Sequence, residues 1–163
     1  MSEKMVPDPG RQAALEEMQG VWARQYESLA ILKENAKTIL SYTSLFLGLI
    51  GILQISNFFS SPSIVYKWLA SAAAIGYIVL VWLTLTILGP AKVQGPIDSD
   101  RGVLEEYFYD KTGDELVEQR IASYLGAIRK NDVVIMKRAV MLTWASRLFA
   151  TIIFLLFLMG IFA

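Results

Sequence analysis

The chain of 163 residues contains no cysteine and no histidine. Their absence excludes disulfides, thiolate or imidazole metal sites, cysteine nucleophiles and every catalytic triad that needs an imidazole base. Fifteen basic residues balance fifteen acidic ones, so the chain lacks the net positive charge that holds nucleic acid through its phosphates. Carboxylates, hydroxyls, Lys and Arg could still bind magnesium or act as acid and base if they converge in a pocket, as a membrane enzyme that uses carboxylates would require, but no spacing in the sequence indicates such a pocket. We therefore expect neither an enzyme nor a nucleic-acid partner, and neither a metal nor a resident cofactor.

Apolar residues make up 55% of the chain, and the mean hydropathy is +0.46. They gather in three long runs that contain almost no charge. At about 1.5 Å per residue, a helix over the first run is roughly 33 Å long, enough to cross the hydrocarbon core of a bilayer. The third run contains one charge, Arg147. The sequence predicts an integral membrane protein with transmembrane helices at 38–59, 67–90 and 139–163.

The distribution of Lys and Arg near these runs predicts their orientation, because basic residues accumulate on the cytoplasmic side of a membrane. The turn at 60–66 and its edge carry a single basic residue, Lys67. We expect the N-terminal helix (1–37) and the loop and helix at 91–138 to be cytoplasmic, the turn at 60–66 to be external, and the C-terminus to be external. The basic residues that support this orientation are Lys33, Lys37, Lys92, Arg129, Lys130, Lys137 and Arg138.

The two segments expected in the cytoplasm also have helical patterns, so the predicted fold class is all-α with long cytoplasmic helical extensions. The first is a seam with alternating spacings of three and four that runs into the first span. Gln25 lies in this seam, where it either fixes the register against a partner helix or lies at a solvated end. The second helix follows the chain breaks at 89–100, with Thr112 or Asp114 as its cap. The seam consists of Leu15, Met18, Trp22, Gln25, Leu29, Leu32, Ala36, Ile39, Thr43, Phe46, Ile50 and Leu53.

Four local features together resemble a known family. They are Asn35-Ala36-Lys37 before the first span, Gly89-Pro90 with Lys92 after the second, the run from Leu104 to Asp110 followed by Asp114 to Gln119, and Ile128-Arg129-Lys130 before the third. This layout, from about residue 26 to the C-terminus, resembles the transmembrane effectors of Pycsar bacterial antiphage defence. The two-span SLATT-type membrane effectors are the near alternative, from which this chain departs by its third span.

The resemblance implies a function. In that family a partner pyrimidine nucleotide cyclase makes a cyclic nucleotide, cUMP or cCMP, during infection. The effector responds by impairing the bacterial inner membrane, which causes abortive infection. A small helical scaffold or accessory subunit of another membrane complex is the alternative function.

A cyclic nucleotide needs a cation for its phosphate and a flat surface for its base. The segment 101–130 supplies both, and we expect the ligand to bind there. The alternative is that its aromatic residues pack on the N-terminal helix around Trp22 and Tyr26. The candidate ligand-binding residues are Arg120, Tyr107, Arg101, Lys111 and Tyr124.

Residues within the spans are candidates for a role in the membrane. Arg147 either lines a pore or extends its side chain to the cytoplasmic headgroups. Ser41, Thr43 and Ser44 either line a hydrated lumen in a homo-oligomer or bond to carbonyls of their own helix. Small residues at four-residue spacing suit close packing, either between copies or within one chain. These pairs are Ser44 with Gly48, Ala70 with Ala74, and Ala72 with Gly76.

Overall fold

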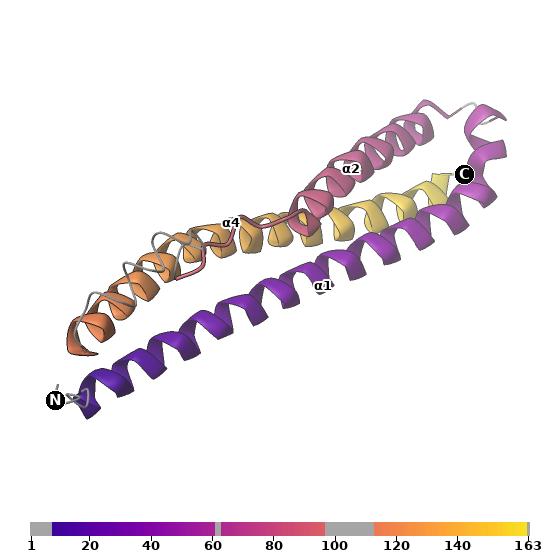
Figure 1. The fold of residues 1–163 in the computed structure, drawn as a ribbon. Coiled ribbons are helices and arrows are strands. Elements are labelled where there is room, and N and C mark those ends of the chain that lie inside the picture. The colour runs from indigo at the N-terminus through magenta and orange to yellow at the C-terminus, as the bar shows by residue number, and fades with distance from the viewer. Residues whose placement is uncertain (1–7, 61–62, 97–112, 163) are drawn as a thin grey trace, which may run out of the picture. The chain divides into compact units, whose positions relative to one another are not determined.

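The computed structural model describes residues 8–60, 63–96 and 113–162, with the backbone alone for 49–60 and 162. These residues form three helices and no strand: α1 (Pro9–Ser60), α2 (Ile64–Leu88) and α4 (Gly113–Phe162) (Figure 1). The expectation of an all-α fold is confirmed for the described residues. Two helical stretches, Ile64–Leu88 and Gly113–Ile161, are long and apolar enough to cross a membrane.

The single long helix predicted from the seam is confirmed by α1, which continues through Gly20 without interruption. Its start follows from Asp8 and Pro9. The Asp8 carboxylate accepts the N–H of Gly10 at 3.1 Å, and the Asp8 carbonyl accepts those of Arg11 and Gln12. Proline suits the first helical position because an N–H at this position has no carbonyl partner within the helix, so the lack of an N–H in proline costs no hydrogen bond.

Helix α2 begins at Ile64, earlier than the predicted boundary at 67, because Ser63 caps it. The Ser63 hydroxyl accepts the N–H of Tyr66 at 3.4 Å. The helix ends before Gly89-Pro90 as predicted, since proline disfavours a helical conformation in the residue that precedes it.

Helix α4 begins at Gly113, which places Asp114 and Glu115 inside its first turn. Asp114 is therefore not the residue that precedes and caps the helix, whereas Thr112 lies outside the described residues. Both carboxylates in this turn interact favourably with the positive end of the helix dipole.

The chain divides into two compact units. Unit 1 comprises Met1–Leu29 and Ala91–Met136, and unit 2 comprises Ala30–Pro90 and Lys137–Ala163. Helices α1 and α4 each contribute to both units, whereas α2 belongs to unit 2 alone.

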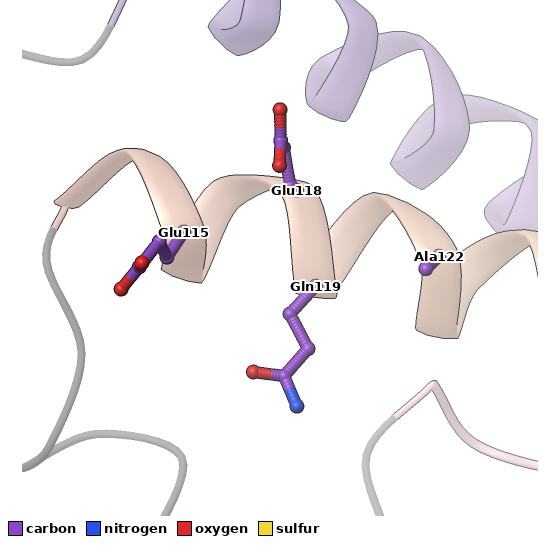
Figure 2. Close-up of a pocket in the computed structure, with 4 residues that line it drawn as sticks. All are labelled: Glu115, Glu118, Gln119 and Ala122. Carbon is purple, nitrogen blue, oxygen red and sulfur yellow. The ribbon is translucent and has the colours of Figure 1, made fainter.

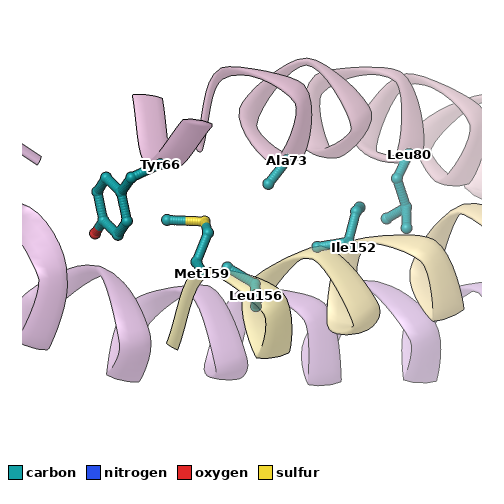
Figure 3. Packing of buried hydrophobic residues seen from close by; sticks show 6 residues of the cluster. All are labelled: Tyr66, Ala73, Leu80, Ile152, Leu156 and Met159. Atoms are coloured by element: carbon teal, nitrogen blue, oxygen red, sulfur yellow. The ribbon is translucent and has the colours of Figure 1, made fainter. Parts of the chain in front are cut away.

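In unit 2, every seventh residue along each helix is buried. Figure 3 shows Tyr66, Ala73 and Leu80 of α2 facing Ile152, Leu156 and Met159 of α4. A seven-residue period keeps one face of each helix against its neighbours and is typical of left-handed coiled coils and of many transmembrane bundles. The buried lines are Ala36 and Thr43 on α1, Tyr66, Ala73, Leu80 and Ile87 on α2, and Arg138, Ala145, Ile152 and Met159 on α4.

The α1 part of this core differs in one place from the predicted seam. Ile39 and Thr43 lie inward as predicted, but Phe46 is 40% exposed and Leu47 packs against the core instead. Unit 2 gives α1 two neighbouring helices, so the buried stripe is wider than a two-helix seam and includes Leu40 and Leu47. The side chains of Ile50 and Leu53 lie outside the described residues.

Close contacts fix the register of α2 against α1 and α4, to which it runs antiparallel in unit 2. A Cβ atom built on Gly76 would lie 3.3 Å from Cγ1 of Ile152, so α2 and α4 touch at this level. The hydroxyls of Ser44 and Tyr77 lie 3.2 Å apart and connect α1 to α2. Gly76 therefore serves packing within one chain, one of the two roles open to the small residues.

Arg138 closes the end of α2. Its buried guanidinium donates through Nη1 to the carbonyl of Ile87 at 2.6 Å and through Nη2 to that of Gly89 at 3.0 Å. Carbonyls in the last turn of a helix have no N–H partner within that helix, and this end of the helix attracts positive charge. Arg138 thus has a structural role in addition to the orientation signal inferred from the sequence.

The contact at Gly76 predicts a difference between two identical substitutions. Gly76→Val places side-chain atoms against Ile152 in the packed core and should lower the free energy of unfolding by about 1–3 kcal/mol. Gly48→Val is the matched control, because a Cβ atom there meets nothing within 4 Å. Thermal unfolding in detergent measures both. Equal losses of stability would contradict the proposed packing.

Candidate functional site

Two of the five candidate ligand residues, Arg120 and Tyr124, lie in α4 within unit 1. They are half-buried and one helical turn apart, so they share a face of the helix. Arg101, Tyr107 and Lys111 lie outside the described residues. The structure thus brings together one cation and one aromatic ring of the predicted set.

Tyr124 packs on the N-terminal helix, as the alternative for the aromatic residues predicted. Its ring meets the Trp22 ring edge to face at 6.2 Å between centroids, and Trp22 contacts Tyr26 at 4.5 Å. Edge-to-face geometry is a favourable packing of aromatic rings. Trp22 thus lies between two tyrosines, and Tyr26 remains 41% exposed.

Next to these rings, Gln25 is buried between α1 and α4. Its side-chain amide donates to the carbonyl of Ile128 at 3.0 Å and to the carboxylate of Asp132 at 2.6 Å. The first of the two interpretations of Gln25 is therefore confirmed: it pairs across a helix interface instead of lying at a solvated end. A buried amide of this kind favours one register of two helices.

Two polar atoms of this cluster, Oε1 of Gln25 and Nε1 of Trp22, are buried without a hydrogen-bond partner in the part of the chain that the structure describes. Each such atom costs free energy because it has lost its hydrogen bonds to water. The cluster around Gln25 is therefore a specific arrangement that gains less stability than its buried area suggests.

Asn131 holds the chain that follows α2 against α4, also within unit 1. Its side-chain amide accepts the N–H of Gln94 at 3.0 Å and donates to the carbonyl of Gln94 at 3.2 Å. Asn131 is almost fully buried. The sequence does not predict this pair, because a single Asn in a helix does not indicate a partner 37 residues away.

Ion pairs join the first turn of α1 to the first two turns of α4. Arg11 lies 3.0 Å from Glu118 and 3.8 Å from Asp114, and the N–H of Asp8 donates to Asp114 at 3.4 Å. The groups are partly exposed, so solvent screening leaves each pair a small contribution to stability. These contacts tie together the starts of the two helices.

An open depression on α4 is lined by Glu115, Glu118, Gln119 and Ala122 (Figure 2). Figure 2 shows Glu118 extending toward α1 and Gln119 extending from another side of α4. Its described lining residues include no cation, and their two carboxylates would repel a phosphate. These four residues by themselves do not fit the nucleotide predicted from the sequence. No cluster of acidic residues able to hold a metal ion occurs in the described ranges.

In unit 2, the three predicted hydroxyl residues have different surroundings. Thr43 is fully buried and donates to the carbonyl of Ile39 at 2.6 Å, which is the intrahelical alternative. Ser44 is exposed and pairs with Tyr77, and Ser41 lines an open depression on α1. A lumen lined by these residues in an oligomer stays a prediction.

Arg147 is exposed on α4, and its guanidinium carbon lies 5.2 Å from the centre of the Trp144 ring. This is a cation–π contact with a residue one turn closer to the start of the helix. The side chain therefore extends back along α4 toward Lys137.

The outer surface of unit 2 is apolar on all three helices. Large side chains with 40% or more of their surface exposed recur along it, including two tryptophans of α2, Trp68 and Trp82. Patches this extensive are rare on monomeric proteins in water. The others are Ile31, Tyr42, Leu45, Phe46, Ile64, Val65, Ile75, Ile78, Val79, Leu85, Val140, Trp144, Phe154, Phe157 and Ile161.

Comparisons with known proteins give no family assignment: no protein-family model, no curated protein and no solved structure matches this chain.

The bond from Gln25 to Asp132 predicts an energetic coupling between the two residues. Because the acceptor is a carboxylate, a double-mutant cycle with Gln25→Ala and Asp132→Ala should give a coupling of about 1.5–3 kcal/mol in the free energy of unfolding. Ser28→Ala is the control for α1, since Ser28 bonds only to its own helix in the described structure. A coupling near zero would show that this bond does not stabilise the helix pair.

Proposed function

We propose that this chain is an integral protein of the bacterial inner membrane that crosses the bilayer three times. The observation that supports this most is the apolar outer surface of unit 2. In water these side chains would be exposed at a large cost in free energy, whereas lipid tails accept them. Unit 1 differs, since both of its helices expose charged residues such as Glu16, Glu17, Arg129 and Lys130.

The positions of aromatic and basic residues suit a bilayer of ordinary thickness. Lys67 and Trp68 lie at one end of α2, and Gly89 follows the other end. The 22 residue steps from Lys67 to Gly89 correspond to about 33 Å of helix, close to the hydrocarbon thickness of a membrane. Trp82 of α2 and Trp144 of α4 lie within about one helical turn of the same level, given the contacts at Gly76 and Ile87. Trp68, beside Lys67, lies at a level where exposed tryptophans are typical of the membrane interface.

The third span in this proposal is α1. Ile39, Leu40 and Leu47 pack against the core that α2 and α4 form, and Ser44 meets Tyr77. With this antiparallel register, Lys33 of α1 lies near the level of the end of α2 at Leu88. Basic residues at this end, including Lys92 and Lys137, favour a cytoplasmic location for it and for the N-terminus, and an external C-terminus.

Within this frame, we propose that the protein is a membrane effector of antiphage defence. A cyclic pyrimidine nucleotide, cUMP or cCMP from a partner cyclase, activates it to oligomerise and impair the inner membrane. The family resemblance supports this proposal, and so does the pairing of α1 with α4 in unit 1. Both helices also enter unit 2, so a ligand that changes their pairing in unit 1 acts on helices that continue into the bilayer.

The scaffold alternative receives less support. It requires the seam of α1 to hold another protein, but Gln25 and Leu29 of this seam are already buried within the same chain.

Because the chain has no cysteine, single-cysteine variants test the proposed topology. In spheroplasts, a membrane-impermeant maleimide should label Ile64→Cys and leave Gln12→Cys and Lys92→Cys unlabelled. All three positions are exposed, so lysed membranes provide the control in which every variant is labelled. Labelling of Lys92→Cys in intact spheroplasts would contradict the proposed orientation.

Membrane potential tests the proposed activity. Cells that express this protein together with a pyrimidine cyclase should lose their membrane potential, measured with a voltage-sensitive dye, whereas either protein alone should not cause this loss. Arg120→Gln should require about tenfold or more nucleotide for the same effect, since a hydrogen bond to a charged group contributes about 1.5–3 kcal/mol. Arg129→Gln, an exposed cation on the same helix, is the control. An unchanged potential at verified membrane expression would refute nucleotide activation.

A further inference from the structure

We infer that Arg147 and Trp144 of α4 bind the phosphate of an anionic phospholipid in the cytoplasmic leaflet, and that Lys137, on the same face of α4, selects its headgroup. The inference depends on the proposed insertion of unit 2 in a membrane, but not on the proposed response to nucleotides.

The geometry of Arg147 is the first step. The residue is exposed on the apolar part of α4, and its guanidinium lies against the face of the Trp144 ring, 5.2 Å from its centre. Side chains on a helix tilt toward its N-terminus, and this contact holds Arg147 in that direction. The charge is therefore turned toward the end of α4 where Lys137 lies, instead of toward the middle of the span.

The counter-ion of Arg147 is the second step. Residues 35–97 and 133–163 contain no Asp and no Glu. Neither the spans of this chain nor those of a second copy therefore supply a carboxylate at this level. The ion pairs in the described structure are both made by Arg11, far from it in sequence. A guanidinium in a bilayer needs an anion, and the phosphate of a lipid headgroup is the anion available at the membrane interface.

The hydroxyls around Arg147 do not replace that anion. Thr143, Ser146 and Thr151 each donate to a carbonyl one turn earlier in α4, at 2.9–3.0 Å. Their protons are thus engaged within the helix. The guanidinium donors and the Trp144 indole N–H are the groups of this face suited to a phosphate oxygen.

Lys137 gives the site its selectivity. It is exposed seven residues before Trp144, which places it on the same side of α4 and about 10 Å nearer the helix start. Two cations on one face repel the amine or choline of a zwitterionic headgroup and favour a headgroup with a net negative charge. Cations near a membrane surface favour anionic lipid by about fivefold each in affinity.

Native mass spectrometry of the purified full chain tests this site, with phosphatidylglycerol and phosphatidylcholine offered in competition. The wild type should retain phosphatidylglycerol preferentially, and Arg147→Gln should reduce that preference about fivefold. Arg147→Lys should retain part of it, because the charge remains while the planar, bidentate donor is lost. Arg129→Gln, which removes an exposed cation of unit 1, should keep it in full.

Two further measurements distinguish a failure of membrane insertion from a failure of the lipid site. Flotation with lipid vesicles shows whether the wild type and Arg147→Gln insert at all. If neither floats, membrane insertion itself fails. If both float and retain phosphatidylglycerol equally, the lipid site is overturned while the membrane protein stands. Excess inorganic phosphate should not displace the lipid, and displacement would show a site for free anions instead.

Discussion

The seven-residue spacing of buried side chains is the constraint on which the whole arrangement depends. Along α4 it runs from Val117 through Asn131 and Arg138 to Ile152 and Met159, and α1 and α2 follow the same period. The chemistry at these positions changes along the chain. In unit 1 the buried face includes hydrogen-bonding amides, which favour one register over others. In unit 2 small and aliphatic residues pack closely, as suits helices that associate in lipid.

Arg138 lies where these two kinds of packing meet in the sequence of α4. Its guanidinium satisfies carbonyls at the end of α2 that would otherwise lack a partner. A buried cation without a carboxylate is costly unless hydrogen bonds and a favourable dipole compensate for the lost water. The end of α2 supplies both, so the position of α2 beside α4 and the burial of Arg138 depend on each other.

Much of the fold could be predicted from the sequence, because the positions of its helices follow from the spacing of apolar residues and from local helix-ending residues. Residues close together in the sequence are enough to predict three features: the seven-residue period of α1, the end of α2 at Gly89-Pro90, and the apolar runs. Contacts between distant segments could not be predicted in this way. Arg138 resembled an ordinary basic residue at a membrane edge, and Asn131 gave no sign of its pairing with Gln94. The prediction that Phe46 lies in the buried seam is wrong, because a seam between two helices does not account for the contacts of α1 with a third helix. Of the candidate ligand residues, Tyr124 packs beside Trp22, as the alternative for the aromatic residues predicted, and its role in ligand binding stays a prediction.

In the proposed membrane arrangement, the apolar surface of unit 2 lies against lipid. The most direct measurement is fractionation of cell membranes after an alkaline carbonate wash, which removes peripheral proteins and leaves integral ones. We predict that the full chain remains in the membrane pellet and is released only by detergent. Recovery of the chain in the wash as a soluble, monodisperse protein would contradict the account, because the exposed aromatic and aliphatic residues would then face water.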